Sequence, residues 1–175
     1  MTIFIAGMHG AGKTFIAKPA SEKLGARYAT ASQLIREERG LLAWPPSRIV
    51  SDVEQNQRVL ISAVQRILMD GRDLILDGHF VLRRAPGVHE RLPISVFRDL
   101  QCKCAILLTV PTEVLIDRLR ARGDETWSLK EVAAFDNEEL QHGRDVTRAL
   151  GIPLFVLNSP DIMTFEAMLQ ANMVR

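Results

Sequence analysis

Eight residues near the N-terminus, Gly7-Met8-His9-Gly10-Ala11-Gly12-Lys13-Thr14, have the composition and spacing of a loop that binds phosphate groups. In such a loop, glycines bring backbone N–H groups close to the anion, a lysine ammonium reaches the outer oxygens, and a hydroxyl ligates Mg²⁺. The loop follows an apolar strand pattern over 2–6 and precedes a helical pattern whose N-terminus would face the anion. The spacing predicts a nucleotide-phosphate site made of His9, Gly10, Ala11, Gly12, Lys13, Thr14 and Phe15.

An acidic residue and a histidine follow a second strongly apolar segment, which reads Leu74-Ile75-Leu76-Asp77-Gly78-His79. Open α/β sheets bind their ligands at the carboxyl ends of the strands, so Asp77 is predicted to hold Mg²⁺ together with Thr14. The alternative is an aspartate that caps a loop, because Asp-Gly is a common turn pair. His79 either contacts substrate or moves a proton, or it is simply hydrogen-bonded into the loop.

Two arginines at helical spacing provide another candidate phosphate contact. Residues 113–123 have the pattern of a helix that ends in glycine, and Arg118 and Arg122 lie four residues apart on one face of it. Guanidinium groups above a γ-phosphate stabilise the charge that spreads over its oxygens during phosphoryl transfer. The alternative is a solvated basic face paired with Asp117 or Glu113.

These residues need a parallel sheet to bring them together, and the apolar pattern predicts one. Strand-type segments alternate with helical patterns at residues 2–6, 27–30, 73–77, 103–110 and 153–157. One long helix is predicted over 52–70, and another begins after Ser128 with a capping box and ends at Gly151. The last helix is expected to begin at Ser159-Pro160, and Pro19 to kink or end the helix after the phosphate loop.

Length and charge limit the classes of protein that fit this chain. Its 175 residues predict one domain, and 22 Lys+Arg against 21 Asp+Glu leave no basic field for DNA or an anionic membrane. The longest apolar run, residues 105–110, is too short to span a bilayer, and the first residues lack the pattern of a signal peptide. We therefore expect a cytoplasmic protein whose partners are neither membranes nor DNA, while its oligomeric state stays open.

Taken together, these motifs resemble those of the P-loop nucleoside monophosphate kinases, and within them the short archaeal type of adenylate kinase. The phosphate loop has the G-x-x-G-x-G-K-T form that these kinases favour over the general motif. Asp77-Gly78-His79 is similar to the archaeal D-T-H, while Pro86-Gly87 and Leu92-Pro93 stand where P-x-G-Y and L-P occur. Ser32-Gln33-Leu34-Ile35-Arg36 is similar to G-D-L-L-R, and residues 117–122 to the D-R-x-x-x-R at the entrance to the lid.

The resemblance implies a three-layer P-loop NTPase fold in one kinase domain over residues 1–175, with a five-stranded parallel sheet in the order 2-3-1-4-5 flanked by helices. It also implies transfer of the γ-phosphoryl group of ATP, with Mg²⁺, to a small-molecule nucleotide acceptor, a nucleoside monophosphate and AMP first of all. The implied catalytic residues are Lys13, Arg118 and Arg122, with Arg118 also binding ATP. The implied acceptor-binding residues are Arg36, His79 and Arg83, with an acceptor-binding insertion at about 30–60 and a short lid at about 122–130.

Two departures from the family pattern, together with one tryptophan- and proline-containing segment, keep other functions open. The lid is only Asp124-Glu125-Thr126-Trp127, without the further arginines that many family members place there. Arg83 and Arg84 lie beyond the usual position of the acceptor arginine, and Trp44-Pro45-Pro46 would shape an unusual pocket or a rigid turn. The alternatives are a kinase for another small acceptor, such as a deoxynucleotide or a metabolite, and an ATP-hydrolysing switch that engages a protein or RNA partner.

Overall fold

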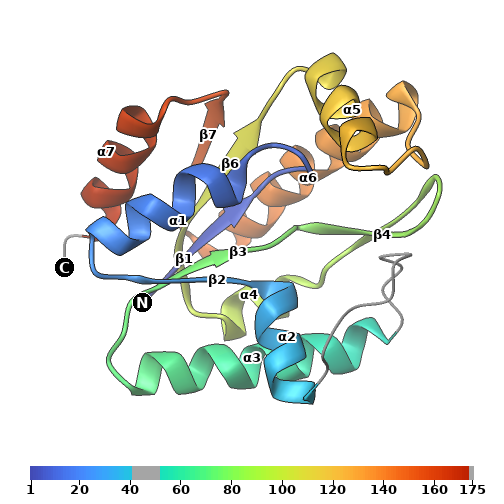
Figure 1. Cartoon of the computed structure of the whole chain (residues 1–175). Coiled ribbons are helices and arrows are strands. Elements are labelled where there is room, and N and C mark those ends of the chain that lie inside the picture. The colour runs from blue at the N-terminus through green and yellow to red at the C-terminus, as the bar shows by residue number, and fades with distance from the viewer. Residues whose placement is uncertain (41–51, 174–175) are drawn as a thin grey trace.

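A computed structural model describes residues 1–40 and 52–173 and contains a five-stranded parallel sheet (Figure 1). Its strands are β1 (Thr2–Ala6), β2 (Arg27–Thr30), β3 (Leu74–Asp77), β6 (Cys102–Thr109) and β7 (Leu154–Asn158). They lie in the order β2-β3-β1-β6-β7. Counted along the chain, these five sheet strands have the predicted order 2-3-1-4-5, so the fold prediction is confirmed.

Helices cover both faces of the sheet and complete the three layers (Figure 1). On one face, α1 (Lys13–Lys23) packs against α7 (Ile162–Met173). On the other lie α3 (Val53–Met69), α4 (Ile94–Asp99) and α6 (Leu129–Leu150). The remaining helices extend these layers: α2 (Ala31–Arg39) packs against α3, and α5 (Thr112–Ala121) against α6.

The central strands β1 and β3 are buried over their whole lengths. A parallel sheet covered on both faces favours continuous apolar runs over alternation, which is why these strands could be identified from sequence. In the pairing of the two strands, Ile5 stands opposite Asp77, so their carboxyl ends lie side by side. The phosphate loop and the acidic residue after β3 therefore meet at one edge of the sheet.

The predicted ends of the helices are mostly confirmed. Ser128 Oγ accepts a hydrogen bond from the Glu131 backbone N–H at 3.1 Å, and Gly151 ends α6 with φ 66°. The predicted start of the last helix is wrong, because Asp161 Oδ1 caps it by accepting the Thr164 N–H at 2.7 Å. Helix α1 also continues past Pro19, since that residue lies on the exposed side, where water can bond the carbonyl that loses its partner.

A two-stranded antiparallel hairpin, β4 (Val81–Ala85) with β5 (Val88–Arg91), was not predicted. The two strands are joined by Pro86-Gly87, and Gly87 has φ 72°, which a glycine accommodates without strain. The hairpin contacts α6 and carries Arg83 above the sheet edge. It therefore decides where that arginine can act.

Within the described ranges, no helix is long and apolar enough to cross a membrane. The Trp44-Pro45-Pro46 segment lies outside the described residues, as does the rest of 41–51 within the predicted acceptor insertion.

Candidate functional site

The phosphate loop turns sharply from β1 into α1 and passes very close to β6. Gly7 has φ 133°, and a Cβ built on it would lie 2.4 Å from the Leu108 carbonyl oxygen. Gly10 and Gly12 also have positive φ values, 89° and 92°. Side chains at these positions would be strained, so the glycines are what let the backbone form this tight loop ahead of the N-terminus of α1.

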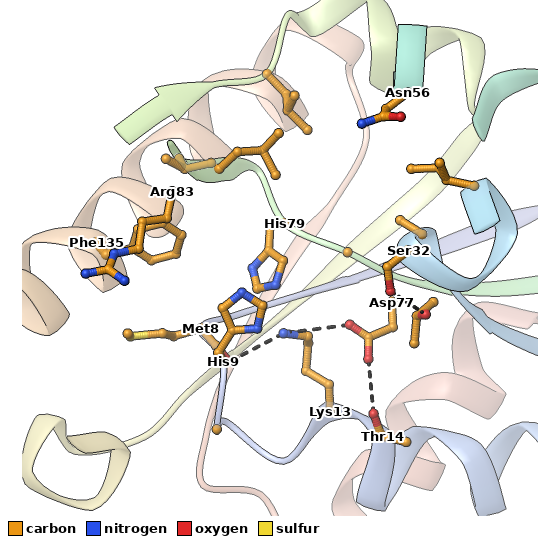
Figure 2. Close-up of a pocket in the computed structure, with 18 of the residues that line it drawn as sticks. Met8, His9, Lys13, Thr14, Ser32, Asn56, Asp77, His79, Arg83 and Phe135 are labelled. Carbon is orange, nitrogen blue, oxygen red and sulfur yellow. Dashed lines mark hydrogen bonds and ion pairs between the residues drawn. The ribbon is translucent and has the colours of Figure 1, made fainter. Parts of the chain in front are cut away.

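Lys13 places its ammonium at the centre of the loop (Figure 2). The residue is 7% exposed, and Nζ donates to the carbonyl oxygens of Gly7 at 2.5 Å and Met8 at 3.4 Å. Nζ also lies 3.7 Å from Asp77 Oδ1. Because these contacts hold the Lys13 ammonium in place, the charge is already positioned for an anion that enters the loop.

Thr14 and Asp77 meet as predicted, and Tyr28 joins them. Thr14 Oγ1 lies 3.4 Å from Asp77 Oδ2, and the Tyr28 hydroxyl donates to the same carboxylate oxygen at 2.7 Å. Burial, and then the charge of Asp77, raise the pKa of Tyr28 above its ordinary range, so this hydroxyl stays a donor. Tyr28 was missed in the sequence analysis, although its strand β2 pairs in register with β3.

A hydroxyl and a carboxylate are the hard oxygen donors that fit Mg²⁺. This ion usually binds through one or two carboxylates together with substrate phosphates, rather than in an all-protein cage. In the part of the chain that the structure describes, no group of three or more His, Cys, Asp or Glu residues is arranged to hold a metal. Thr14 and Asp77 therefore suit a metal that is shared with a nucleotide.

His79 lines the same space but is also hydrogen-bonded into the fold. Its Nδ1 lies 2.7 Å from Oε1 of Glu139, a fully buried residue of α6. The centre of its ring lies 4.3 Å from that of His9, with the two ring planes tilted by 51° (Figure 2). Burial, and then Lys13, lower the pKa of His79 to about 3, while burial raises the pKa of Glu139 to about 8. At neutral pH both side chains are therefore uncharged, and they share one hydrogen bond.

The raised pKa of Glu139 predicts a pH-dependent stability. Above pH 6.5 the unfolded carboxyl is ionised while the folded one keeps its proton up to about pH 8, so the free energy of unfolding should fall as pH rises through this window. The slope should reach at most about 1.4 kcal/mol per pH unit. His79 opposes this slope only near pH 6.5, where its unfolded imidazole still titrates, and adds nothing above about pH 7.5. Urea unfolding of Glu139→Gln should show a flatter dependence, and an unchanged slope would contradict the assignment.

Of the two predicted arginines, Arg118 of α5 contacts the phosphate loop, and Arg122, which directly follows α5, lines the cavity described below. Arg118 Nη1 donates to the Gly10 carbonyl at 2.8 Å. Arg36, on α2, lines the same cavity, and its buried Nε has no hydrogen-bond partner within the described ranges. The structure thus brings Arg118 to the loop, and places Arg122 and Arg36 in the walls of the cavity.

Arg83 is engaged in a different way from Arg36. Its guanidinium makes four hydrogen bonds, two to the Glu131 carboxylate and two to Thr126, and lies 3.9 Å from the centre of the Trp127 ring. Trp127 is itself 5% exposed, and its Nε1 donates to Asp124. Arg83 therefore fastens the hairpin to the short lid, and its predicted role toward an acceptor stays a prediction.

A cavity of about 890 Å³ connects these groups. The predicted residues that line it are His9, Gly10, Gly12, Lys13, Thr14, Phe15, Arg36, Asp77, His79, Arg83 and Arg122. Ala11 is buried within the loop, and Arg118 contacts the loop from outside this lining. The cavity continues past the loop toward α2, α3 and α4, where its walls become largely apolar.

Sequence comparison places this geometry in a family. The profile of a family described as an AAA domain matches residues 6–133. A protein of Thermococcus onnurineus (strain NA1) named "Putative adenylate kinase" is 31% identical over 140 residues, which are 80% of this chain. The match spans 64% of that protein, so the chain corresponds to about two thirds of its length.

Solved structures share the fold over nearly the whole chain. Shikimate kinase from Bacteroides thetaiotaomicron has a TM-score of 0.60 at 20% identity and covers 98% of this chain and 97% of its own. Shikimate kinase from Acinetobacter baumannii, in complex with shikimate, has a TM-score of 0.61 at 15% identity, with 99% and 95% covered. Deoxyadenosine kinase from M. mycoides has a TM-score of 0.55 at 16% identity, with 99% and 98% covered.

At 15–20% identity, these solved structures establish only the fold. Family membership is shown by the profile match, which covers most of the chain. The glycine loop, the buried lysine and the Thr14–Asp77 pair lie inside the matched region. The chain therefore belongs to this AAA-domain family of P-loop proteins.

Proposed function

We propose that this protein is a phosphotransferase that moves the γ-phosphoryl group of ATP to a small acceptor, with nucleoside monophosphates, and AMP first, as the acceptor class. The observation that carries the proposal is the continuous cavity. It has the phosphate loop with Lys13 and Asp77 at one end and Arg36 on another wall. Two anionic substrates can thus occupy one space with their reacting groups close together.

The proposed mechanism needs positioning and charge neutralisation, and no covalent intermediate. Lys13 and the loop N–H groups would neutralise the β- and γ-phosphates, and Thr14 and Asp77 would hold the Mg²⁺ that offsets their remaining charge. Arg118 and Arg122 would cover the transferred group, as the resemblance to adenylate kinases implies. Arg36 would hold the acceptor anion, which suits its buried Nε because this donor has no hydrogen-bond partner among the described residues.

The relative named "Putative adenylate kinase" also supports AMP as the first acceptor to test. The experiment measures ADP formed from ATP and Mg²⁺, alone and with each nucleoside monophosphate in turn, and identifies the phosphorylated product. Strong stimulation by one monophosphate is expected. Slow hydrolysis that no monophosphate changes would contradict this acceptor class, and would favour a different small acceptor or an ATP-dependent switch.

Replacing Arg36 should weaken the use of the acceptor without changing the reaction of ATP alone. Arg36→Ala is expected to raise the KM for the acceptor by about 10- to 100-fold, because a charge-assisted contact to an anion is lost. Hydrolysis of ATP without acceptor should change little. Arg58→Ala, which removes an exposed arginine of α3, is the matched control. An equal loss of acceptor-free hydrolysis in Arg36→Ala would contradict the placement of Arg36.

A further inference from the structure

Gln57 is a buried amide with an unsatisfied carbonyl oxygen in the part of the chain that the structure describes. It lies on α3, is 8% exposed and lines the cavity. Its Oε1 is buried and has no hydrogen-bond partner among the described residues. Buried side-chain oxygens are usually paired, because losing water without gaining a partner is unfavourable.

The neighbouring amide shows the ordinary arrangement. Asn56 is 1% exposed, and its Oδ1 accepts a hydrogen bond from Arg39 Nη1 of α2 at 2.7 Å. That bond ties α2 to α3 and gives Asn56 a structural role. Gln57 has the same chemistry and nearly the same burial and also lines the cavity, but its carbonyl oxygen has no hydrogen-bond partner among the described residues.

The surroundings of Gln57 suit a flat ring. One helical turn further along α3 is Leu60, and this part of the cavity, which we call the apolar slot, is lined by Ile35, Leu60, Val96, Phe97 and Leu100. Figure 2 shows Asn56, the neighbour of Gln57, at the far end of the pocket from Lys13. An acceptor anchored by its anion near the loop would therefore extend its other end into the slot.

Among the described residues, two buried polar atoms of opposite character along this cavity lack hydrogen-bond partners. Arg36 Nε is a donor and suits an anion, whereas Gln57 Oε1 is an acceptor and requires a donor. A ligand that satisfies both has a negative group at one end and an N–H group on an apolar ring at the other. A nucleoside monophosphate whose base carries an exocyclic amine has this chemistry.

We propose that Gln57 is a specificity-determining residue, whose Oε1 accepts a hydrogen bond from the exocyclic amine of an adenine or cytosine base in the apolar slot. The inference rests on the proposed function and adds to it the class of base that is selected. Bases without that amine leave Oε1 buried and unpaired, so they bind more weakly.

The test is equilibrium binding of AMP and CMP, and of the same two nucleotides lacking the exocyclic amine, to the wild type and to Gln57→Met. The wild type should prefer at least one amine-bearing nucleotide over its amine-free analogue by about tenfold or more. Gln57→Met should bind both members of that pair alike, with unchanged affinity for ATP. Gln55→Met, at an exposed glutamine of the same helix, should retain the wild-type preference.

Thermal unfolding without ligand separates this role from a structural one. Gln57→Met replaces an unpaired amide with an apolar side chain of similar length, so its Tm should equal or exceed that of the wild type. A lower Tm with parallel losses of ATP and monophosphate affinity would overturn the inference.

The remaining outcomes distinguish the two proposals. If the wild type binds AMP or CMP and Gln57→Met keeps the same preference for the amine, only the inference about Gln57 is overturned, and the proposed function stands. The same holds for a wild type that binds these nucleotides without preferring the amine. A wild type that binds none of the four monophosphates would overturn the proposed acceptor class, and this inference with it.

Discussion

Lys13→Met should lower the rate of phosphoryl transfer by about 1,000-fold, the scale expected when a preorganised charge is removed from a transition state. Lys13 Nζ is the buried cation nearest the centre of the loop, 3.7 Å from Asp77, and methionine keeps its length without its charge. Single-turnover measurements with ATP and the best acceptor would report the chemical step directly.

Lys18→Met is the matched control for this prediction, because Lys18 is exposed on the same helix. It should leave the rate unchanged. We expect only a modest fall in Tm for Lys13→Met, since Tyr28 and Thr14 still contact the Asp77 carboxylate. A rate that falls less than tenfold would contradict the role of Lys13.

Gly7→Ala should have the largest effect on stability, about 3 kcal/mol or more of the free energy of unfolding. Gly7 has φ 133°, and its added Cβ would lie 2.4 Å from the Leu108 carbonyl oxygen, so either β1 or β6 would have to move. Because both strands are central, the backbone has little room to adjust. Urea unfolding measures the loss, and the variant should also bind ATP poorly.

Gly123→Ala measures the cost of backbone strain without the close contact that Gly7→Ala would make with Leu108. Gly123 also has a positive φ, 76°, but a Cβ there would meet no atom within 4 Å. Its loss should be about 1–2 kcal/mol, the value for a left-handed alanine alone. Equal losses at both glycines would show that the contact with Leu108 adds nothing.

The parts predicted from sequence are those that depend on local patterns. Buried parallel strands appear as continuous apolar runs, which placed β1, β3 and β6. The phosphate loop and the cap of α6 at Ser128 have signals confined to a few adjacent residues. Asp77 could be placed near Thr14 because both follow strands that the predicted order makes neighbours.

The parts that were missed depend on contacts between distant segments. Tyr28 reaches Asp77 across 49 positions of the chain and Glu139 reaches His79 across 60, and neither stands in a recognisable motif. The hairpin did have a local signal, Pro86-Gly87 between two short runs, but we assigned that pair to a family motif instead of a turn. The four hydrogen bonds of Arg83 depend on that hairpin, so they were missed together with it.

Arg83 also determines whether the segment around Thr126 and Trp127 loses its conformational entropy on folding or on ligand binding. A long, loose lid must become ordered each time a ligand enters, and that ordering opposes binding. Here the segment around Thr126 and Trp127 is already held against the hairpin by Arg83, so most of its ordering is completed when the chain folds. The predicted lid is thus preorganised: it lacks extra arginines, but its immobilisation would add little to the entropic cost of closing over a phosphate group.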